Sequence, residues 1–479
     1  MTRGRFAALV CSVVVMGTIG APSGASAQSG DGGEIRVVTQ NLYLGADLGD
    51  ALARVPDVAA VAQSLWDQVA ATDFPQRVPV LAAEVVAADP AVIGLQEATT
   101  WLCTPDAETE PVAVFDFTAE YLDATAAAGS AYAVASSGGA EAFSPGYAID
   151  PIVGATVVSD PETFGPLFGT DTASCGFRIA DALLVRTDLA DDVVAVGIRT
   201  YDAVAELVPG FIVVQRGYAW ADVNIDGTTV RFVTTHLESV WDPGAVPNSV
   251  TQSRQLVADL AGVAGPLVVM GDFNADPRDP RPAGEPNPGG QPEASDACQG
   301  RACNAYWTMV DAGYTDVGPD ATDPANATWG ADGLLAGPDL DRVEAAVTAG
   351  NPYGYTDRLD YVFVRNGVSV LSAEILGEDW PNGTSTWPCD DPEQVANTAS
   401  AAEALGAPAP EAGVCLASDH AAIVATVALS EPGEAADGSS TSGNAGDEGG
   451  TGPVVWVMAG VGVVVVAGAA VALALRRSR

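Results

Sequence analysis

The residues best suited to chemistry stand at the ends of apolar, strand-like runs. The run at residues 266–270 is rich in β-forming residues and is stopped by Gly271, so Asp272 and Asn274 emerge where the predicted strand ends. With Phe273 between them, the carboxylate and the amide point to the same side of an extended segment. Such a pair suits a cation and a phosphate oxygen. The same short motif is also consistent with a turn that closes a strand.

The only two histidines of the chain also stand at predicted strand ends. His236 ends an apolar strand at residues 229–236, and His420 follows Asp419 directly before the apolar run at residues 421–429. A single histidine near a strand end is more often structural than catalytic. Because both histidines share this position, and one has an aspartate beside it, we interpret both as functional.

Six motifs, found between residues 34 and 429, carry the candidate polar groups. In chain order they are TQNLYLG with Asn41, IGLQE with Glu97, TTHLES with His236, GDFNADP with Asp272 and Asn274, DRLDYVFV with Asp360, and SDHAAI with Asp419 and His420. Together they resemble the endonuclease/exonuclease/phosphatase superfamily, which includes DNase I-like nucleases, inositol polyphosphate phosphatases and sphingomyelinases. The resemblance implies an α+β fold, a four-layer α/β/β/α sandwich of the DNase I-like type.

The resemblance also implies a phosphoester hydrolase that depends on a divalent metal ion. In the family, the residues matching Asn41 and Glu97 lie at the metal site, and we expect Asp419 to contribute there. Oxygen ligands of this type suit magnesium, so we expect Mg²⁺, with Mn²⁺ or Ca²⁺ as substitutes and either one ion or two. Such an ion counters the repulsion between the phosphate oxygens and the nucleophile.

The catalytic roles follow from the same resemblance. Asp360 and His420 would form a carboxylate–imidazole pair in which the acid fixes the tautomer of the ring. His420 would activate water or steady the phosphoryl oxygens, Asp272 would help to position that water, and Asn274 would hold the phosphate. His236 would stabilise the developing charge or protonate the leaving group.

Four other positions match the family less specifically. Arg178 and Asp181 precede a predicted strand near the place where DNase-like members keep groups that touch phosphate or orient a histidine. Arg358 would either touch the substrate or brace its loop. Asp47 would either cap a following helix or support a residue of the site.

Apolar patterns predict the elements that must position these groups. The predicted helices cover residues 76–88 and 251–260, and the predicted strands cover residues 34–39, 90–95, 182–186, 211–214, 219–223, 230–235, 266–270, 359–364 and 421–429. The succession of strand, helix and strand at the start implies a sandwich whose central strands carry catalytic groups at one end and whose helices cover the outside.

Three segments that interrupt the strand pattern, residues 101–176, 277–301 and 377–416, are predicted to be long loops around the site. Six cysteines remain in the mature chain, and an even number in an exported protein favours disulfides. We predict that they brace these loops as Cys103–Cys175, Cys298–Cys303 and Cys389–Cys415. Aromatic candidates for the walls of the site, each of which has ordinary packing as its alternative, are Trp101, Phe143, Tyr147, Trp241, Trp307, Trp329, Trp380 and Trp387.

The two ends of the chain predict export and attachment to a membrane. Residues 1–27 have the basic, apolar and small-residue regions of a signal peptide, although Cys11 raises a lipoprotein alternative in a poor sequence context. Residues 34–429 would form the catalytic domain, and the Gly, Ser and acidic residues at 430–453 a flexible linker. The uncharged residues 454–475 predict a transmembrane helix, and the basic tail at 476–479 would keep the catalytic domain outside the cell.

The formal net charge of -42 disfavours tight binding of nucleic acid, and every basic side chain is arginine. A local arginine could still hold a phosphate, because the Debye length is only about 8 Å at physiological salt. The phosphodiester substrate could thus be a nucleic acid, a phospholipid or a small phosphate. A different class of function is a non-catalytic cell-surface binding module on the same fold, although such members would be expected to lose a histidine or a metal ligand.

Overall fold

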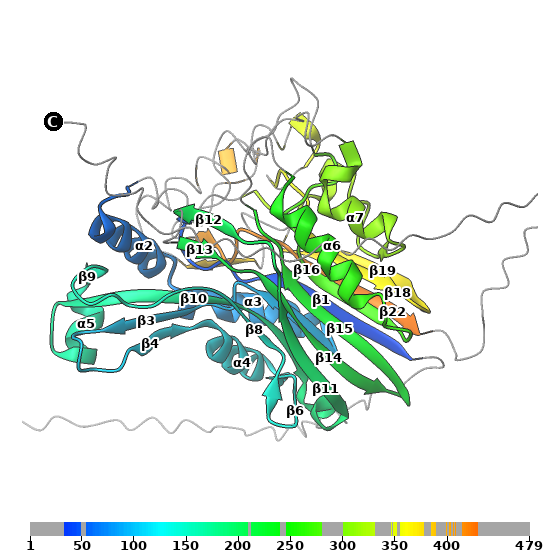
Figure 1. Cartoon of the computed structure of the whole chain (residues 1–479), viewed down its shortest axis with the longest axis horizontal. Coiled ribbons are helices and arrows are strands. Elements are labelled where there is room, and N and C mark those ends of the chain that lie inside the picture. The colour runs from blue at the N-terminus through cyan, green and yellow to red at the C-terminus, as the bar shows by residue number, and fades with distance from the viewer. Residues whose placement is uncertain are drawn as a thin grey trace, which may run out of the picture. The chain divides into compact units, whose positions relative to one another are not determined.

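Two β-sheets stack face to face at the centre of this computed structural model (Figure 1). The first sheet has the strand order β19-β22-β1-β2-β10-β3-β4, and the second has the order β11-β14-β15-β16-β18-β17. Their inner faces share one buried apolar cluster, to which Val37 and Leu183 contribute from the first sheet and Phe232 and Val268 from the second. The chain therefore folds as a mixed α/β sandwich.

The structure describes residues 33–48, 54–208, 212–239, 246–279, 300–330, 346, 348–351, 355–377, 385–388, 399, 402–403, 406, 408 and 414–429. All of them belong to the unit Met1–Pro432. The predicted signal peptide, linker, transmembrane helix and basic tail lie outside the described residues. Within the described ranges, no helix is both long enough and apolar enough to cross a bilayer.

The first sheet contains β1 (Glu34–Asn41), β2 (Val92–Gln96), β3 (Thr100–Thr104), β4 (Val112–Asp116), β10 (Thr172–Arg186), β19 (Val368–Leu376) and β22 (Ala422–Leu429). Three further strands pair with β10, namely β5 (Tyr132–Val134), β8 (Phe143–Ile149) and β9 (Val157–Ser159). The second sheet contains β11 (Val193–Thr200), β14 (Gly217–Ile225), β15 (Thr228–His236), β16 (Leu267–Asp272), β17 (Thr315–Asp316) and β18 (Asp360–Arg365). Short pairs outside the sheets include β12 (Ala205–Val208) with β13 (Ile212–Val214), and β20 (Thr386–Pro388) with β21 (Val414–Leu416).

Helices pack against the outer faces of both sheets. On the first sheet these are α2 (Val58–Thr72), α3 (Phe74–Ala88), α4 (Phe117–Ala128) and α5 (Pro161–Phe168), and on the second α6 (Asn248–Leu260) and α7 (Ala305–Asp311). Leu81 and Val85 of α3 and Leu256 and Leu260 of α6 are buried because they lie on the faces turned toward the sheets. The predicted helices at 76–88 and 251–260 therefore exist and start slightly earlier than expected.

The segment at residues 101–176 is not a loop, which corrects the sequence-based expectation. It contains β3, β4, α4, β8, β9 and α5, and β10 begins ten residues before the predicted strand at 182–186. Small residues interrupt the apolar pattern of this segment, so its strands were not recognised in the sequence. Most residues of β10 are nevertheless buried in the structure. Cys103 and Cys175 are register partners on β3 and β10, so their disulfide joins two neighbouring strands rather than bracing a loop.

Each of the other two predicted disulfides has only one of its cysteines among the described residues. Cys303 and Cys415 are each disulfide-bonded, and their predicted partners, Cys298 and Cys389, lie outside the described residues. The same holds for most of the predicted loops at 277–301 and 377–416.

The strand register brings distant motifs to one end of the sandwich. β1 and β2 run parallel, as do β15 and β16, so the carboxyl ends of each pair lie together. β18 runs antiparallel to β16 and therefore begins at that end. In the first sheet β22 runs antiparallel to β1, so the turn that precedes it is also placed there.

Two glycines allow the close approach that this arrangement requires. A Cβ on Gly94 of β2 would lie 2.9 Å from Oγ1 of Thr234, on the facing sheet. A Cβ on Gly271 would collide with the backbone oxygen of Thr235 on the neighbouring strand. Gly271 was expected to stop its strand, but β16 continues through it to Asp272.

Candidate active site

Three adjacent strands of the second sheet each contribute one polar side chain at the same level. His236 on β15 is the register partner of Asp272 on β16, which in turn is the partner of Asp360 on β18. All three side chains are buried. Nε2 of His236 lies 3.4 Å from Oδ2 of Asp272.

Two residues from the first sheet complete this group. The amide nitrogen of Asn41, at the end of β1, donates to Oδ2 of Asp272 at 3.1 Å. Nδ1 of His420 lies 2.9 Å from Oδ2 of Asp360, and its Nε2 lies 3.7 Å from Oδ2 of Asp272. One carboxylate oxygen of Asp272 therefore faces an amide and both imidazoles of the chain.

Local hydrogen bonds fix the ring of His420. The hydroxyl of Ser418 accepts from the backbone N–H of His420 at 3.2 Å and donates to the backbone oxygen of Asn41 at 2.9 Å. The hydroxyl of Thr328 donates to Oδ2 of Asp360 at 2.6 Å, on the same oxygen that faces the ring. Burial alone would lower the pKa of His420, but Asp360, Asp419 and Asp272 outweigh it and hold this pKa well above its usual value.

His236 is held neutral, in contrast to His420, whose pKa is raised. A guanidinium can only donate, so Arg216, whose nitrogen lies 3.0 Å from Nδ1 of His236, makes Nδ1 the acceptor and places the ring proton on Nε2. Burial, then Arg216 and His420, hold the pKa of His236 well below its usual value. Glu238 lies 3.6 Å from Arg216 and partly balances its charge. The result is a neutral imidazole whose N–H points toward Asp272.

Burial also perturbs the carboxyl groups of the site. It raises the pKa of Asp272 to about 7, an effect that His420 opposes and Asp360 reinforces. It raises the pKa of Asp181, on β10, to about 8, although Arg216 opposes this shift. The backbone N–H of His236 donates to the Asp181 carboxylate. Asp181 thus supports the backbone of His236, whereas Arg178 is exposed and pairs with Asp150.

Glu97 and Asp419 form a second acidic group beside the first. Glu97 directly follows β2 with a φ of 55°, and its carboxylate accepts from the backbone N–H of Leu44. Asp419 accepts from the indole N–H of Trp329 at 3.3 Å. Burial raises the pKa of Asp419 to about 7, His420 opposes the shift, and the charge of Glu97 reinforces it. The two carboxylates are therefore electrostatic neighbours.

The residues present fit a divalent cation. Oδ1 of Asp419 and Oδ1 of Asp360 are buried without a hydrogen-bond partner, which is costly for a carboxylate unless a cation is bound. The side-chain oxygen of Asn41 accepts from the backbone N–H of Tyr43 at 2.9 Å and keeps a second lone pair. Carboxylate and amide oxygens of this kind match the preferences of Mg²⁺.

A second group of possible ligands comprises Asp272, Asp360 and His420. Asp360 and His420 already satisfy each other through their hydrogen bond. That bond uses Oδ2 of Asp360, and Oδ1 of the same carboxylate remains without a partner, as does Oδ1 of Asp419. Each of the two groups therefore keeps a buried carboxylate oxygen that could bind a cation.

Asn274 and Arg358 are both fixed by backbone contacts. Asn274 has a φ of 46°, its backbone N–H donates to Oδ1 of Asp272 at 2.8 Å, and its amide donates to the backbone oxygen of Leu237. Arg358 is buried and donates to the backbone oxygens of Asp360 and Asn326. Of the two roles considered for Arg358, the structure therefore shows the bracing one.

For Asp47, the structure shows a backbone contact, because its N–H donates to the side chain of Gln68 in α2. Leu48, directly after Asp47, is helical, and residues 49–53 lie outside the described part of the chain, so the capping role expected for Asp47 stays a prediction.

The candidate wall residues divide among several roles. Trp329 contacts the site through Asp419 and pairs as a β-bridge with His420. Trp101 and Tyr147 line a separate apolar pocket. Phe143, Trp307 and Trp387 pack within apolar clusters, and Trp241 and Trp380 lie outside the described residues.

Sequence patterns missed Arg77, which is fully buried in α3. Its guanidinium donates to the backbone oxygens of Leu42, Tyr43 and Ala417, and it thereby ties the end of β1 to the turn that carries Asp419 and His420. Burial lowers the pKa of Arg77 to about 10. An arginine within an otherwise apolar helix pattern was the signal that could have identified it.

The family model of the endonuclease/exonuclease/phosphatase family matches residues 39–420. Similar solved structures include an endonuclease/exonuclease/phosphatase from Beutenbergia cavernae (18% identity, 83% of this chain and 72% of that chain, TM-score 0.45). They also include a mannosyl-6-phosphatase from Bacteroides thetaiotaomicron (16% identity, 82% and 100%, TM-score 0.41) and a truncated TDP2 from Caenorhabditis elegans (13% identity, 83% and 98%, TM-score 0.36). No curated protein sequence matches the chain.

Proposed function

The chain belongs to the endonuclease/exonuclease/phosphatase family, and from that premise we propose that it is a divalent-metal-dependent phosphoesterase that hydrolyses phosphodiester bonds. The observation that carries the proposal is the position of Oδ2 of Asp272, which lies 3.4 Å from Nε2 of His236 and 3.7 Å from Nε2 of His420. Two imidazoles that face one carboxylate are suited to hold a phosphoryl group and a water molecule between them.

His420 supplies positive charge to the phosphoryl oxygens. Its Nδ1–H donates to Asp360, and three carboxylates hold its pKa well above the usual value. The protonated ring then presents Nε2–H to the site and stabilises the charge that builds up on the phosphoryl oxygens. Asp360 is a positioning residue in this scheme, because it acts through the ring.

His236 stabilises the leaving group without losing its proton. Arg216 holds its Nδ1 as an acceptor and keeps its pKa low, so the neutral ring donates its Nε2–H as a hydrogen bond. Of the two roles considered for His236, the geometry favours charge stabilisation over proton transfer, because a neutral imidazole is a very weak acid.

Asp272 is the group best placed to receive a proton from water. Burial raises its pKa to about 7, near the value at which a general base combines availability with strength. Asn274 fixes Oδ1 of this carboxylate through its backbone N–H. One amide N–H of Asn274 donates to Leu237, which leaves the other for a phosphate oxygen.

Asn41, Glu97 and Asp419 would hold the cation, for which Mg²⁺ is the expected ion and Mn²⁺ or Ca²⁺ are possible substitutes. When bound, the ion would neutralise phosphate charge and ease departure of the leaving oxygen. The buried Oδ1 of Asp419, which has no hydrogen-bond partner, supports this assignment.

Export and membrane attachment belong to the same proposal. The sequence patterns at residues 1–27 and 454–475 support a catalytic domain outside the cell that is held by a C-terminal helix. Cys103 and Cys175 form a disulfide, which is consistent with an oxidising compartment.

The proposal is tested with bis-p-nitrophenyl phosphate and the full chain. Treatment with EDTA should abolish hydrolysis, and added Mg²⁺ should restore it. Asp419→Asn should weaken the restoration, whereas Asp191→Asn, an exposed control, should not. Metal-independent hydrolysis, or no hydrolysis with Mg²⁺ present, would contradict the proposal.

A further inference from the structure

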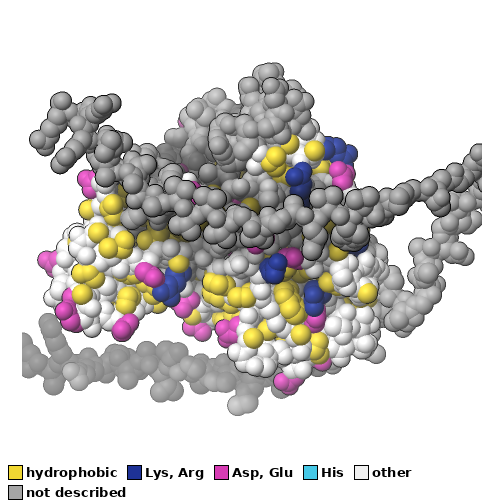
Figure 2. Space-filling view, in the orientation of Figure 1, with side chains coloured by type: hydrophobic (Ala, Val, Ile, Leu, Met, Phe, Trp, Pro, Cys, Tyr) yellow, Lys and Arg dark blue, Asp and Glu magenta, His cyan; other side chains and the backbone are white. Residues whose placement is uncertain are grey.

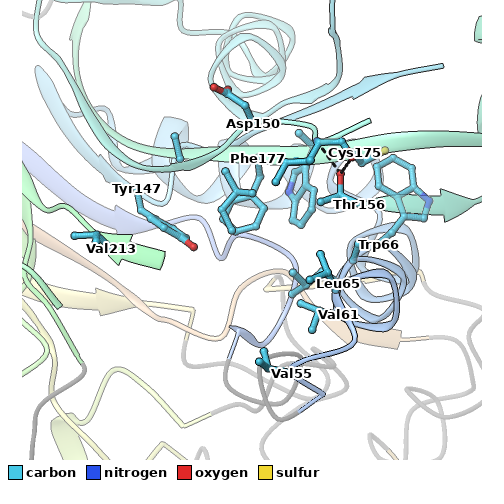
Figure 3. Close-up of a pocket in the computed structure, with 17 residues that line it drawn as sticks. Val55, Val61, Leu65, Trp66, Tyr147, Asp150, Thr156, Cys175, Phe177 and Val213 are labelled. Atoms are coloured by element: carbon cyan, nitrogen blue, oxygen red, sulfur yellow. Dashed lines mark hydrogen bonds between the residues drawn. The ribbon is translucent and has the colours of Figure 1, made fainter. Parts of the chain in front are cut away.

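An apolar pocket of about 510 Å³ lies between α2 and the strands β8 and β10 (Figure 3). Figure 3 shows Val61, Leu65 and Trp66 of α2 on one side and Tyr147, Cys175 and Phe177 on the other. Its volume is in the range of small-molecule sites in proteins. The pocket is separate from the polar centre described above, because it contains none of the predicted catalytic or metal-binding residues.

Apart from the hydroxyl of Tyr147, the main polar side chains of the pocket wall are already engaged. The indole N–H of Trp66 donates to Asp160, and that of Trp101 donates to the backbone oxygen of Leu44. The hydroxyl of Thr156 accepts from the backbone N–H of Ile152. What remains for a ligand is mainly hydrocarbon and aromatic surface. Such a wall offers few partners to the polar edges of a nucleobase but suits a hydrocarbon chain.

The mouth of the pocket is also apolar. Val55, Val58, Ile152 and Val213 all line the pocket, and each residue is between 38% and 45% exposed, as is Val153 next to them at 47%. Exposed apolar residues are ordinary when they are scattered, but a group around one cavity indicates a binding site. The charged pair at this edge, Asp150 and Arg178, is neutral overall.

Three chain segments connect the pocket to the catalytic centre. Trp101 in the pocket wall donates to Leu44, whose own backbone N–H donates to Glu97. On β10, Phe177 of the pocket and Asp181 of the centre are four residues apart, roughly 13 Å along a strand. Val213 of the pocket mouth precedes Arg216 by three residues. The pocket therefore lies beside the catalytic centre, about 13 Å away along β10.

We propose that this pocket binds the hydrocarbon chain of the substrate, which is thus a single-chain amphiphile with a phosphoester head. The inference rests on the proposed phosphoesterase function and extends it to a substrate class. Burial of the hydrocarbon chain in the pocket supplies binding free energy that the polar centre cannot. The strongly acidic composition of the protein does not oppose a ligand of low charge.

A series of p-nitrophenyl alkyl phosphodiesters with methyl, octyl and dodecyl chains tests the proposal with the full chain and Mg²⁺, below the concentration at which the esters associate. Each methylene that enters the pocket should raise kcat/KM by about fourfold, until the pocket is full. The bis-p-nitrophenyl ester reports the catalytic centre without a chain. Equal kcat/KM along the series with normal hydrolysis of that ester would overturn this inference and leave the phosphoesterase proposal intact.

Two variants locate the effect. Ala62→Phe fills the pocket from α2 and should remove most of the advantage of the dodecyl ester while leaving the methyl ester unchanged. Ala70→Phe, at an exposed position of the same helix outside the pocket, is its control. Val58→Asp places a charge at the mouth in the first turn of α2, where an acid suits the helix, and Ala59→Asp is its control. Unchanged chain-length dependence in both pocket variants would overturn the assignment.

Binding provides a readout that does not depend on turnover. Dodecyl phosphate should change the fluorescence of Trp66 and Trp101 in the unmodified chain and in Ala70→Phe, but not in Ala62→Phe. Failure to bind, because a segment of this chain or a second copy occupies the pocket, would contradict the inference. Hydrolysis of an oligonucleotide at a rate that falls in Ala62→Phe would also contradict the inference, since the pocket would then bind a nucleobase.

Discussion

Arg216 lies 3.0 Å from Nδ1 of His236 and thereby decides which nitrogen of that ring carries the proton. The other histidine of the site, His420, has the reverse arrangement, because its Nδ1 faces the carboxylate of Asp360. One imidazole is thus held neutral by a cation and the other is held protonated by an anion. The two rings meet the same oxygen of Asp272 with different charges, which lets them serve different parts of one reaction.

Replacement of Arg216 by Met should raise the pKa of His236, because a cation that opposes protonation of the ring is removed. The ring would also lose its preferred tautomer, so kcat should fall by about 100-fold. NMR titration of the imidazole measures the first effect and steady-state kinetics the second. Arg199→Met, which removes an exposed arginine paired with Asp259, is the matched control. A lower pKa of His236 in Arg216→Met would contradict the assigned tautomer.

Replacement of Asp360 by Asn should lower the pKa of His420, because the strongest carboxylate influence that raises it is lost. We expect turnover to fall by about 100-fold or more, and His420→Ala should cause a loss of similar size. Because both residues act as one unit, the double variant should be little worse than either single one. Fully additive losses in the rates would show that Asp360 does not act through His420.

Asp181→Asn should stabilise the protein at alkaline pH. The folded-state pKa of Asp181 is raised from 3.8 to about 8, so the folded protein holds this proton more tightly than the unfolded chain does. The resulting contribution to stability is fully present below the unfolded pKa and is lost as pH rises through about 8. The amide of Asn remains neutral and avoids this loss.

Thermal unfolding in EDTA measures the effect of Asp181→Asn. The Tm of the variant should exceed that of the unmodified chain at about pH 8.5, and the difference should shrink toward about pH 4. Asp171→Asn, at an exposed position on the same strand region, should show no such dependence. A difference in Tm that is constant with pH would mean that the carboxyl group does not carry the effect.

Arg77→Met should both destabilise the protein and reduce its activity. Three buried backbone oxygens, those of Leu42, Tyr43 and Ala417, would lose their donor. The expected loss in the free energy of unfolding is about 3 kcal/mol or more, since each buried polar group left unpaired costs about 1–3 kcal/mol. Denaturant unfolding measures this loss.

The activity of Arg77→Met should fall at temperatures where the variant is still folded, because the end of β1 and the turn before β22 would no longer be tied together. Arg254→Met is the matched control, as Arg254 is an exposed arginine that donates to one backbone oxygen, that of Ala302. Normal kcat in folded Arg77→Met would confine Arg77 to a role in stability.

The sequence by itself determined the family and the positions of the polar groups at strand ends. Motifs such as GDFN and SDH could be recognised because Asp272 and His420 interrupt local apolar runs, and a break in periodicity is visible within a few residues. The same local reasoning identified β16, which is buried throughout, and β15, which is buried from Phe232 to His236.

Only the tertiary structure decided how those groups are paired and charged. Asn41 and Asp272 are 231 residues apart in sequence, so their hydrogen bond has no local signature. The same is true of Arg216, which sets the tautomer of His236, and of the disulfide between adjacent strands β3 and β10. Periodicity reports which side of an element is buried, whereas tautomers, pKa values and pockets depend on what the other sheet or helix brings against it.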